Sequence, residues 1–129
     1  MNPELQLVDE QQRARRLLVV DDHPTFRDCA RALLEEEGFE VVGEAADGAA
    51  ALVLAAELDP ELVLLDVQLP DLNGFEVASR LLARDPGLRI VLVSSRDRSA
   101  YGSAIEASGA LGFVGKADLS GVALERFLD

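Results

Sequence analysis

The chain contains few of the residues that form disulfides or bind transition metals. Among its 129 residues there are one cysteine, Cys29, and one histidine, His23. A single cysteine excludes an internal disulfide, and the position of Cys29 in an apolar helical pattern predicts a small core residue. Without a cluster of histidines and cysteines, the sequence offers no ligand set for a transition metal.

Long hydrophobic runs are also absent. No apolar run approaches the ~18 residues that a membrane-spanning helix needs, and residues 1–16 lack the apolar stretch of a signal peptide. We therefore expect no membrane association and a cytoplasmic protein.

Basic residues are half as numerous as acidic ones, 12 against 24, and the formal net charge is −12. This charge repels phosphate backbones, so direct binding of nucleic acid or anionic lipid is not expected. Lys116 is the only lysine among the basic residues. Its compact, rotatable ammonium differs from the planar guanidinium of arginine. Its position at a strand end either marks a functional site or reflects an arginine-rich composition.

Short apolar runs alternate with helical patterns after a polar stretch at residues 1–14, which we interpret as a mobile or loosely helical lead-in. Strands are predicted at 17–20, 39–45, 62–65, 89–93 and 111–115. Helices are predicted at 24–37, 48–58, from about 73, at 99–108, which has the weakest pattern, and at 119–128, the last with Leu119, Val122, Ala123 and Phe127 inward. Five alternating strands and helices predict one doubly wound α/β domain, a parallel sheet with helices on both faces.

Each of four predicted strands ends at a reactive or charged side chain. Asp21 and Asp22 follow the first strand, Asp66 the third and Ser94 the fourth, and Lys116 lies just after the fifth. The carboxyl ends of parallel strands meet at one edge of the sheet, so these side chains are expected to share a crevice. The sequence thus predicts a site for a cation and a phosphoryl group.

The predicted carboxylates need a positive partner. Two close carboxylates repel by roughly 4 kcal/mol at an effective dielectric near 20, and hard oxygen ligands with open positions suit Mg²⁺ better than a fully caged Ca²⁺. The helix after Asp66 begins only at about residue 73, which argues against a helix-capping role for that carboxylate. Asp66 is therefore a candidate nucleophile toward phosphorus. Lys116 and the metal would neutralise the phosphoryl charge, and Ser94 is either a hydrogen-bond donor to it or a turn serine.

The segments LLVVDDHPTFR, LVLLDVQLPDLNGFE, IVLVSS and GFVGK, in that order and spacing, resemble the receiver domain of two-component response regulators. The resemblance runs from about Arg16 to Phe127, and Pro70 and Gly74 match the loop after the acceptor. The Asp-Asp-His-Pro opening is most similar to receivers of transcription regulators with a C-terminal helix-turn-helix domain. The resemblance implies a flavodoxin-like (βα)5 fold with strand order 2-1-3-4-5, here a receiver domain over residues 15–129.

The resemblance also implies roles for the strand-end residues. Asp66 would accept the phosphoryl group from a phosphohistidine of a sensor histidine kinase. Magnesium would be bound directly by Asp22, Asp66 and the backbone carbonyl of Gln68, with Asp21 acting through water.

The resemblance further implies that Ser94 and Phe113 form the switch that the family uses. Ser94 and Lys116 would contact the phosphoryl oxygens, and Phe113 would be the aromatic residue that packs inward as Ser94 moves. The surface formed by the helix at 99–108, the fifth strand and the last helix, with Tyr101, Phe113 and Phe127, would then form a homodimer or engage an output domain.

The sequence departs from the family at Ala117, where receivers usually have a proline after a cis peptide bond. A non-proline cis bond costs ~3 kcal/mol, so a trans bond or a more mobile loop is predicted, with Lys116 less firmly placed. His23 precedes Pro24 at a helix start, and we interpret it as a loop residue rather than a phosphate carrier.

Three hypotheses remain after this reading. The first is a phosphoacceptor switch that is not a conventional enzyme. The second is a degenerate receiver that only binds partners, which the departure at Ala117 keeps open. The third is a magnesium-dependent phosphatase with an aspartate nucleophile, similar to haloacid dehalogenases, but Gln68 stands where such enzymes need a second aspartate. Whether the chain is a stand-alone receiver or part of a longer regulator is left open.

Overall fold

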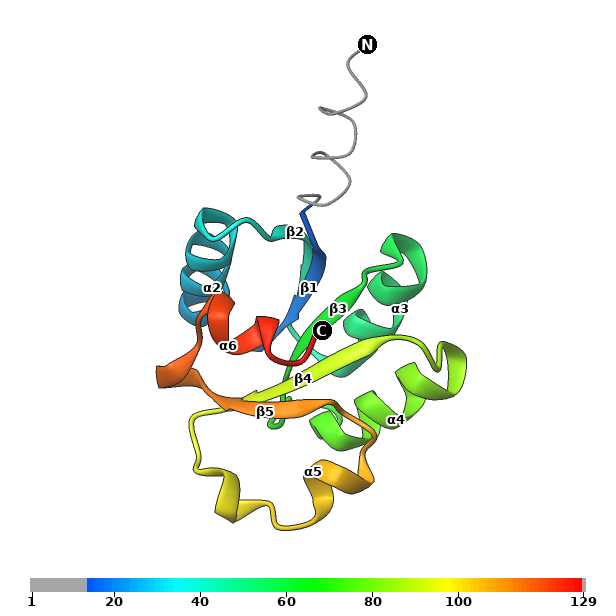
Figure 1. Ribbon diagram of the computed structural model, residues 1–129. Helices are drawn as coiled ribbons and strands as arrows, with labels where there is room; N and C mark the ends of the chain where they lie inside the picture. The colour runs from blue at the N-terminus through cyan, green and yellow to red at the C-terminus, as the bar shows by residue number, and fades with distance from the viewer. Residues whose placement is uncertain (1–13, 129) are drawn as a thin grey trace.

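The computed structural model describes residues 14–128, so all but the last residue of the predicted lead-in lies outside the described part of the chain. A five-stranded parallel sheet has the order β2-β1-β3-β4-β5, as predicted. The strands are β1 (Arg16–Val20), β2 (Glu40–Ala45), β3 (Leu62–Asp66), β4 (Arg89–Ser94) and β5 (Gly112–Gly115). The helices are α2 (Pro24–Glu36), α3 (Gly48–Leu58), α4 (Gly74–Arg84), α5 (Ala104–Ala107) and α6 (Gly121–Glu125). Figure 1 shows them on both faces of the sheet.

Alternate residues of each strand belong to two separate cores. On one face, side chains such as Val20, Leu65 and Leu92 pack under α3, α4 and α5. On the other face, side chains such as Val19 and Leu64 pack under α2 and α6. This two-residue period is that of a strand buried on both sides, which explains why the apolar runs in the sequence are continuous rather than alternating.

Polar side chains fix where the helices begin. The Asp47 carboxylate accepts a hydrogen bond from the Ala50 N–H at the start of α3, and the Asn73 side chain does the same for α4. Asp71, from the loop between β3 and α4, accepts two more hydrogen bonds from the backbone N–H groups of Gly48 and Ala49. Helix α3 is therefore capped partly by the loop that follows β3.

Two predicted helices are shorter than expected. The 99–108 pattern forms a 3-10 turn at Arg98–Ala100 and then the four-residue α5, with Gly102 between them at φ +54°. The 119–128 pattern forms only α6, which begins after Ser120 and is preceded by a 3-10 turn at Lys116–Asp118. The positive φ of Gly102 interrupts the first helix, and the capping hydroxyl of Ser120 delays the start of the second.

Two burial predictions were wrong. Cys29 is exposed, because the buried residues of α2 are Ala30 and Leu34, and Cys29 lies about 100° around the helix from Ala30 and about 140° from Leu34. Val122 is 71% exposed, because α6 directs Leu124 into the core and Val122 lies about half a turn away. Among residues 14–128, no helix has the length and apolar content to cross a membrane.

Candidate functional site

The strand-end side chains divide between the two faces of the sheet. Asp21 and Asp66 continue the alternation of the β1 and β3 residues that face α2 and α6, and Lys116 continues that of β5. Ser94 continues the other set on β4, which faces α4 and α5. The structure therefore brings the carboxylates and the ammonium together on one face of the sheet, whereas the Ser94 side chain lies on the opposite face.

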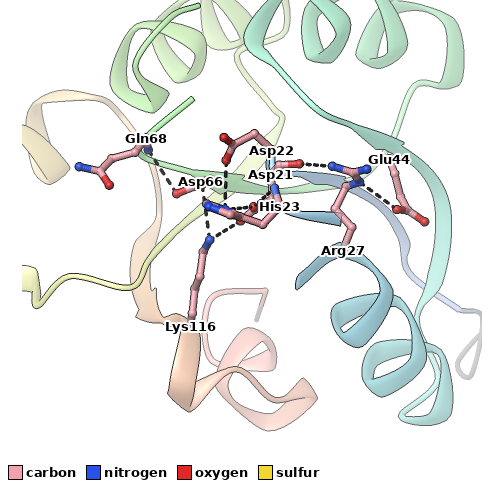
Figure 2. Close-up of polar contacts among 8 residues, drawn as sticks. All are labelled: Asp21, Asp22, His23, Arg27, Glu44, Asp66, Gln68 and Lys116. Atoms are coloured by element: carbon pink, nitrogen blue, oxygen red, sulfur yellow. Dashed lines mark hydrogen bonds and ion pairs between the residues drawn. The ribbon is translucent and has the colours of Figure 1, made fainter. Parts of the chain in front are cut away.

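Lys116 lies among the predicted acidic residues (Figure 2). Its Nζ is 2.6 Å from Asp21 Oδ2 and 3.5 Å from Asp66 Oδ2. The same ammonium lies 4.6 Å from the centre of the Phe26 ring, a cation–π contact from α2. These contacts hold the only lysine of the chain at the carboxylates without the proline that usually follows it. No cis peptide bond occurs in residues 14–128, so the bond between Lys116 and Ala117 is trans, as predicted.

The acidic cluster has the donors that a hard cation needs. Ligand atoms of Asp21, Asp22, His23 and Asp66 lie within 4.8 Å of one another. Two buried oxygens, Asp21 Oδ2 and Asp22 Oδ1, accept no hydrogen bond, although Asp21 Oδ2 is ion-paired with Lys116. Buried polar atoms are normally hydrogen-bonded or bind an ion. The carboxylate set therefore fits Mg²⁺, which prefers one or two carboxylates and keeps several waters.

His23 lies at the rim of the cluster. Its Nδ1 is 3.0 Å from Asp21 Oδ1 and 3.1 Å from Asp22 Oδ1, and its backbone N–H donates to Asp21 Oδ1. The side chain is largely exposed at the start of α2, which agrees with the prediction of a loop residue before Pro24.

The environment of Asp66 raises the pKa of its carboxyl from its ordinary 3.8 to about 6. The main cause is burial, and the second is the charge of Asp21. The backbone N–H of Gln68, which donates to Asp66 Oδ1, and the ammonium of Lys116 lower the pKa but do not cancel the rise. A cation beside Asp66 would offset the cost of burying this carboxylate charge and its repulsion by Asp21.

The loop after Asp66 is held closely against the strand end. The Gly74 N–H donates to the Val67 carbonyl, and Gln68 forms an isolated bridge with Asn73. A Cβ on Gly74 would lie 2.4 Å from the Asp66 carbonyl oxygen and 2.8 Å from Val67 Cα. Only glycine allows α4 to begin this close to the acceptor strand.

Arg27 supports the acidic turn, a role that the sequence analysis missed. Its Nη1 donates to the Asp21 carbonyl at 2.6 Å, and its Nε pairs with Glu44 at 3.2 Å (Figure 2). Glu44 also accepts from Arg31 Nε at 2.6 Å, so two arginines of α2 are joined to β2. The signal was an arginine one helical turn into the segment that follows Asp21 and Asp22, which pattern alone assigns to a solvated helix face.

Ser94 is hydrogen-bonded to an aromatic residue of the segment before α5. Its hydroxyl is hydrogen-bonded to the Tyr101 hydroxyl at 2.6 Å, and the partly buried Phe113 ring lies 5.9 Å from the Tyr101 ring. Phe127 packs with the core under α2 and α6, on the other face of the sheet from Phe113. The three aromatic residues predicted to share one surface are thus divided by the edge strand β5.

Comparison with known proteins agrees with this geometry. The family model described as the response regulator receiver domain matches residues 17–121. BvgA of Bordetella pertussis, named as a transcription regulator of virulence factors, is 42% identical over 101 residues, which are 78% of this chain and 48% of BvgA. The chain spans about half the length of the curated relatives it matches.

Solved structures show the same fold. The receiver domain of the response regulator NarL from Mycobacterium tuberculosis is 35% identical, with a TM-score of 0.78 over 89% of this chain and 97% of that one. The response regulator TrrA from Thermotoga maritima, solved in complex with Mg²⁺ and BeF, is 31% identical, with a TM-score of 0.77 over 87% and 95% of the two chains. With the matching sheet order, the acidic cluster and the lysine beside it, these similarities show that the chain belongs to the response regulator receiver domain family.

Proposed function

We propose that this chain is a phosphoacceptor receiver that takes a phosphoryl group onto Asp66 from a phosphohistidine of a sensor histidine kinase. The observation that carries the proposal is the buried Asp66 carboxylate, which lies beside the acidic pair Asp21 and Asp22 and near the ammonium of Lys116. In the transfer, the bond between phosphorus and the histidine nitrogen breaks and a bond between phosphorus and an Asp66 oxygen forms. The imidazole that leaves takes up a proton at the nitrogen that carried the phosphorus.

Asp22, Asp66 and the backbone carbonyl of Gln68 would hold Mg²⁺, with Asp21 acting through water. The ion would neutralise charge on the phosphoryl oxygens during transfer. The buried Asp22 Oδ1, which accepts no hydrogen bond, supports this assignment. The TrrA structure with Mg²⁺ and BeF supports it as well, because that receiver is 31% identical to this chain.

Lys116 would stabilise the negative charge of the phosphoryl group with its ammonium. In the structure its ammonium is nearer to Asp21 than to Asp66, so we expect it to shift toward Asp66 when Mg²⁺ neutralises the acidic pair. Ser94 would supply a hydroxyl hydrogen bond to the same oxygens, and Phe113 would follow Ser94 by packing inward.

The phosphoryl group would alter the surface made by α5, β5 and α6. That surface would then form a homodimer or contact a DNA-binding output domain, because the relatives are transcription regulators about twice as long as the matched segment. A chain with this kinase partner would act in the cytoplasm.

Phosphorylation at one residue tests the proposal directly. After incubation with acetyl phosphate and Mg²⁺, intact-mass spectrometry should show one added phosphate, absent in Asp66→Asn and retained in Asp28→Asn, which changes an exposed carboxyl of α2. Persistence of the phosphate in Asp66→Asn would assign it to another acid or to His23. No phosphate on the wild-type chain would favour a degenerate receiver that only binds partners.

Metal binding provides a second test. Asp22→Ala should abolish Mg²⁺ binding measured by titration, because it removes a carboxylate whose buried oxygen accepts no hydrogen bond. Unchanged affinity in that variant would overturn the assignment of the metal ligands.

A further inference from the structure

The hydroxyl of Ser94 is fully engaged away from the acceptor. Ser94 is 1% exposed, and its Oγ accepts a hydrogen bond from the Arg96 backbone N–H at 3.0 Å. It also shares a 2.6 Å hydrogen bond with the Tyr101 hydroxyl. Within residues 14–128, Ser94 Oγ has no hydrogen bond to Asp66 or Lys116.

The Tyr101 hydroxyl is held in place by the rings around it. The Tyr101 ring packs edge to face against Phe75 of α4, with centroids 5.6 Å apart, and against Phe113 of β5 at 5.9 Å. Tyr101 itself follows the 3-10 turn that leads into α5, in the segment between β4 and α5 in Figure 1. One phenol thus touches α4, β5 and the end of β4, and the position of its oxygen depends on all three.

The two positions open to Ser94 exclude one another. Its side chain continues the face of β4 that packs under α4 and α5, whereas Asp66 and Lys116 belong to the face under α2 and α6. Whichever hydroxyl donates, the 2.6 Å bond between Ser94 and Tyr101 exists only while the Ser94 side chain keeps this orientation. To donate a hydrogen bond to a phosphoryl oxygen on Asp66, the side chain must turn toward the other face and leave the fixed Tyr101 hydroxyl.

We infer that Tyr101 is a positioning residue that holds Ser94 away from Asp66, and that phosphorylation exchanges this hydrogen bond for one to the phosphoryl group. The inference rests on the proposed function and adds a residue to it. Phe113 has no hydroxyl and cannot hold Ser94 in this way, but its ring contacts the Tyr101 ring, so its inward movement after Ser94 would pass through Tyr101. Release of Tyr101 would change the packing of β5, because the Tyr101 ring contacts Phe113. It would also change the position of α5, because Tyr101 lies in the segment that leads into that helix.

The chain carries its own reporter for this exchange. Tyr101 is the only tyrosine and there is no tryptophan, so intrinsic ultraviolet emission comes from Tyr101 alone. Titration with beryllofluoride in Mg²⁺ should change this emission in step with the bound signal seen by fluorine NMR. In Asp66→Asn neither signal should appear.

Substitution separates the hydrogen bond from the packing. Tyr101→Phe keeps the ring and removes only the hydroxyl, so it should bind beryllofluoride with Mg²⁺ roughly 2- to 10-fold more tightly, the factor that one net hydrogen bond represents. In a Ser94→Ala background the same substitution should have no effect on affinity. Ser103→Ala, which removes an exposed hydroxyl in the same segment, should match the wild type.

The outcomes distinguish this inference from the proposed function. Unchanged or weaker binding by Tyr101→Phe, an effect that persists in the Ser94→Ala background, or bound beryllofluoride with unchanged tyrosine emission would each overturn the inference alone. The absence of bound beryllofluoride in the wild type would overturn the proposed function and the inference together.

Discussion

Replacing Asp66 with asparagine should stabilise the fold at neutral pH, although it destroys the proposed acceptor. The carboxyl is buried beside Asp21, and these two causes raise its pKa from 3.8 to about 6. Asparagine has nearly the same shape, and its carbonyl oxygen can accept the Gln68 N–H that Asp66 accepts. The substitution therefore removes an unfavourable buried charge and little else.

The size of the effect follows from the pKa. Each pKa unit corresponds to about 1.4 kcal/mol, so ionised Asp66 costs the fold up to about 3 kcal/mol. The attraction of Lys116 is already contained in this pKa, so the expected gain on removing the charge is up to about 3 kcal/mol. Because the folded protein holds the Asp66 proton more tightly than the unfolded chain, stability from this carboxyl is fully present below pH 4. It is lost as the pH rises through 6.

Urea unfolding of both proteins from pH 4 to pH 8 without metal measures the prediction. Asp66→Asn and the wild type should be nearly equally stable at pH 4, and the variant should be more stable at pH 8. Mg²⁺ should stabilise the wild type at pH 8 more than the variant, and Asp28→Asn should show no such pH-dependent gain. An equal difference at both pH values, or a less stable variant at pH 8, would refute the account of Asp66 as a destabilising buried charge.

Two substitutions in the loop after the acceptor test how it is held. Gly74→Ala should lower the free energy of unfolding by at least about 2 kcal/mol, because its Cβ would meet the backbone of Asp66; a stability within error of the wild type would show that α4 can shift without cost. Asp47→Ala and Asp71→Ala each remove a cap of α3, but only Asp71 also ties down the loop that contains Gln68. Mg²⁺ titration should therefore show a few-fold weaker binding in Asp71→Ala than in Asp47→Ala, and equal affinities would exclude a role of the tether in metal binding.

The strand ends were predictable because the signals that mark them are local. Continuous apolar runs, each stopping at a polar side chain, gave β1 and β3 to within one residue at each end and placed Asp21 and Asp66 at one edge of the sheet. Asn73 caps α4, in agreement with the predicted start of that helix at about residue 73. The order of the strands came from the family resemblance, since alternation alone does not choose among doubly wound orders.

Helix faces were predicted less well, because a few degrees of rotation decide burial. Cys29 and Val122 both lie beside truly buried positions, and an apolar pattern does not distinguish a residue at the edge of the buried stripe from one at its centre. The breaks at Gly102 and Ser120 shorten the last two helices, which left too few turns to define a periodic face.

The sequence by itself determined which chemical groups reach the carboxyl edge of the sheet, because strand length and two-residue alternation are properties of each segment alone. Only the tertiary structure decided how those groups pair. The preference of Lys116 for Asp21 over Asp66, the bond from Arg27 to the Asp21 carbonyl and the bond between Ser94 and Tyr101 depend on distances between different elements. Those distances are set by sheet twist, by the rotation of α2 and by the path of the chain into α5, and no local pattern encodes them.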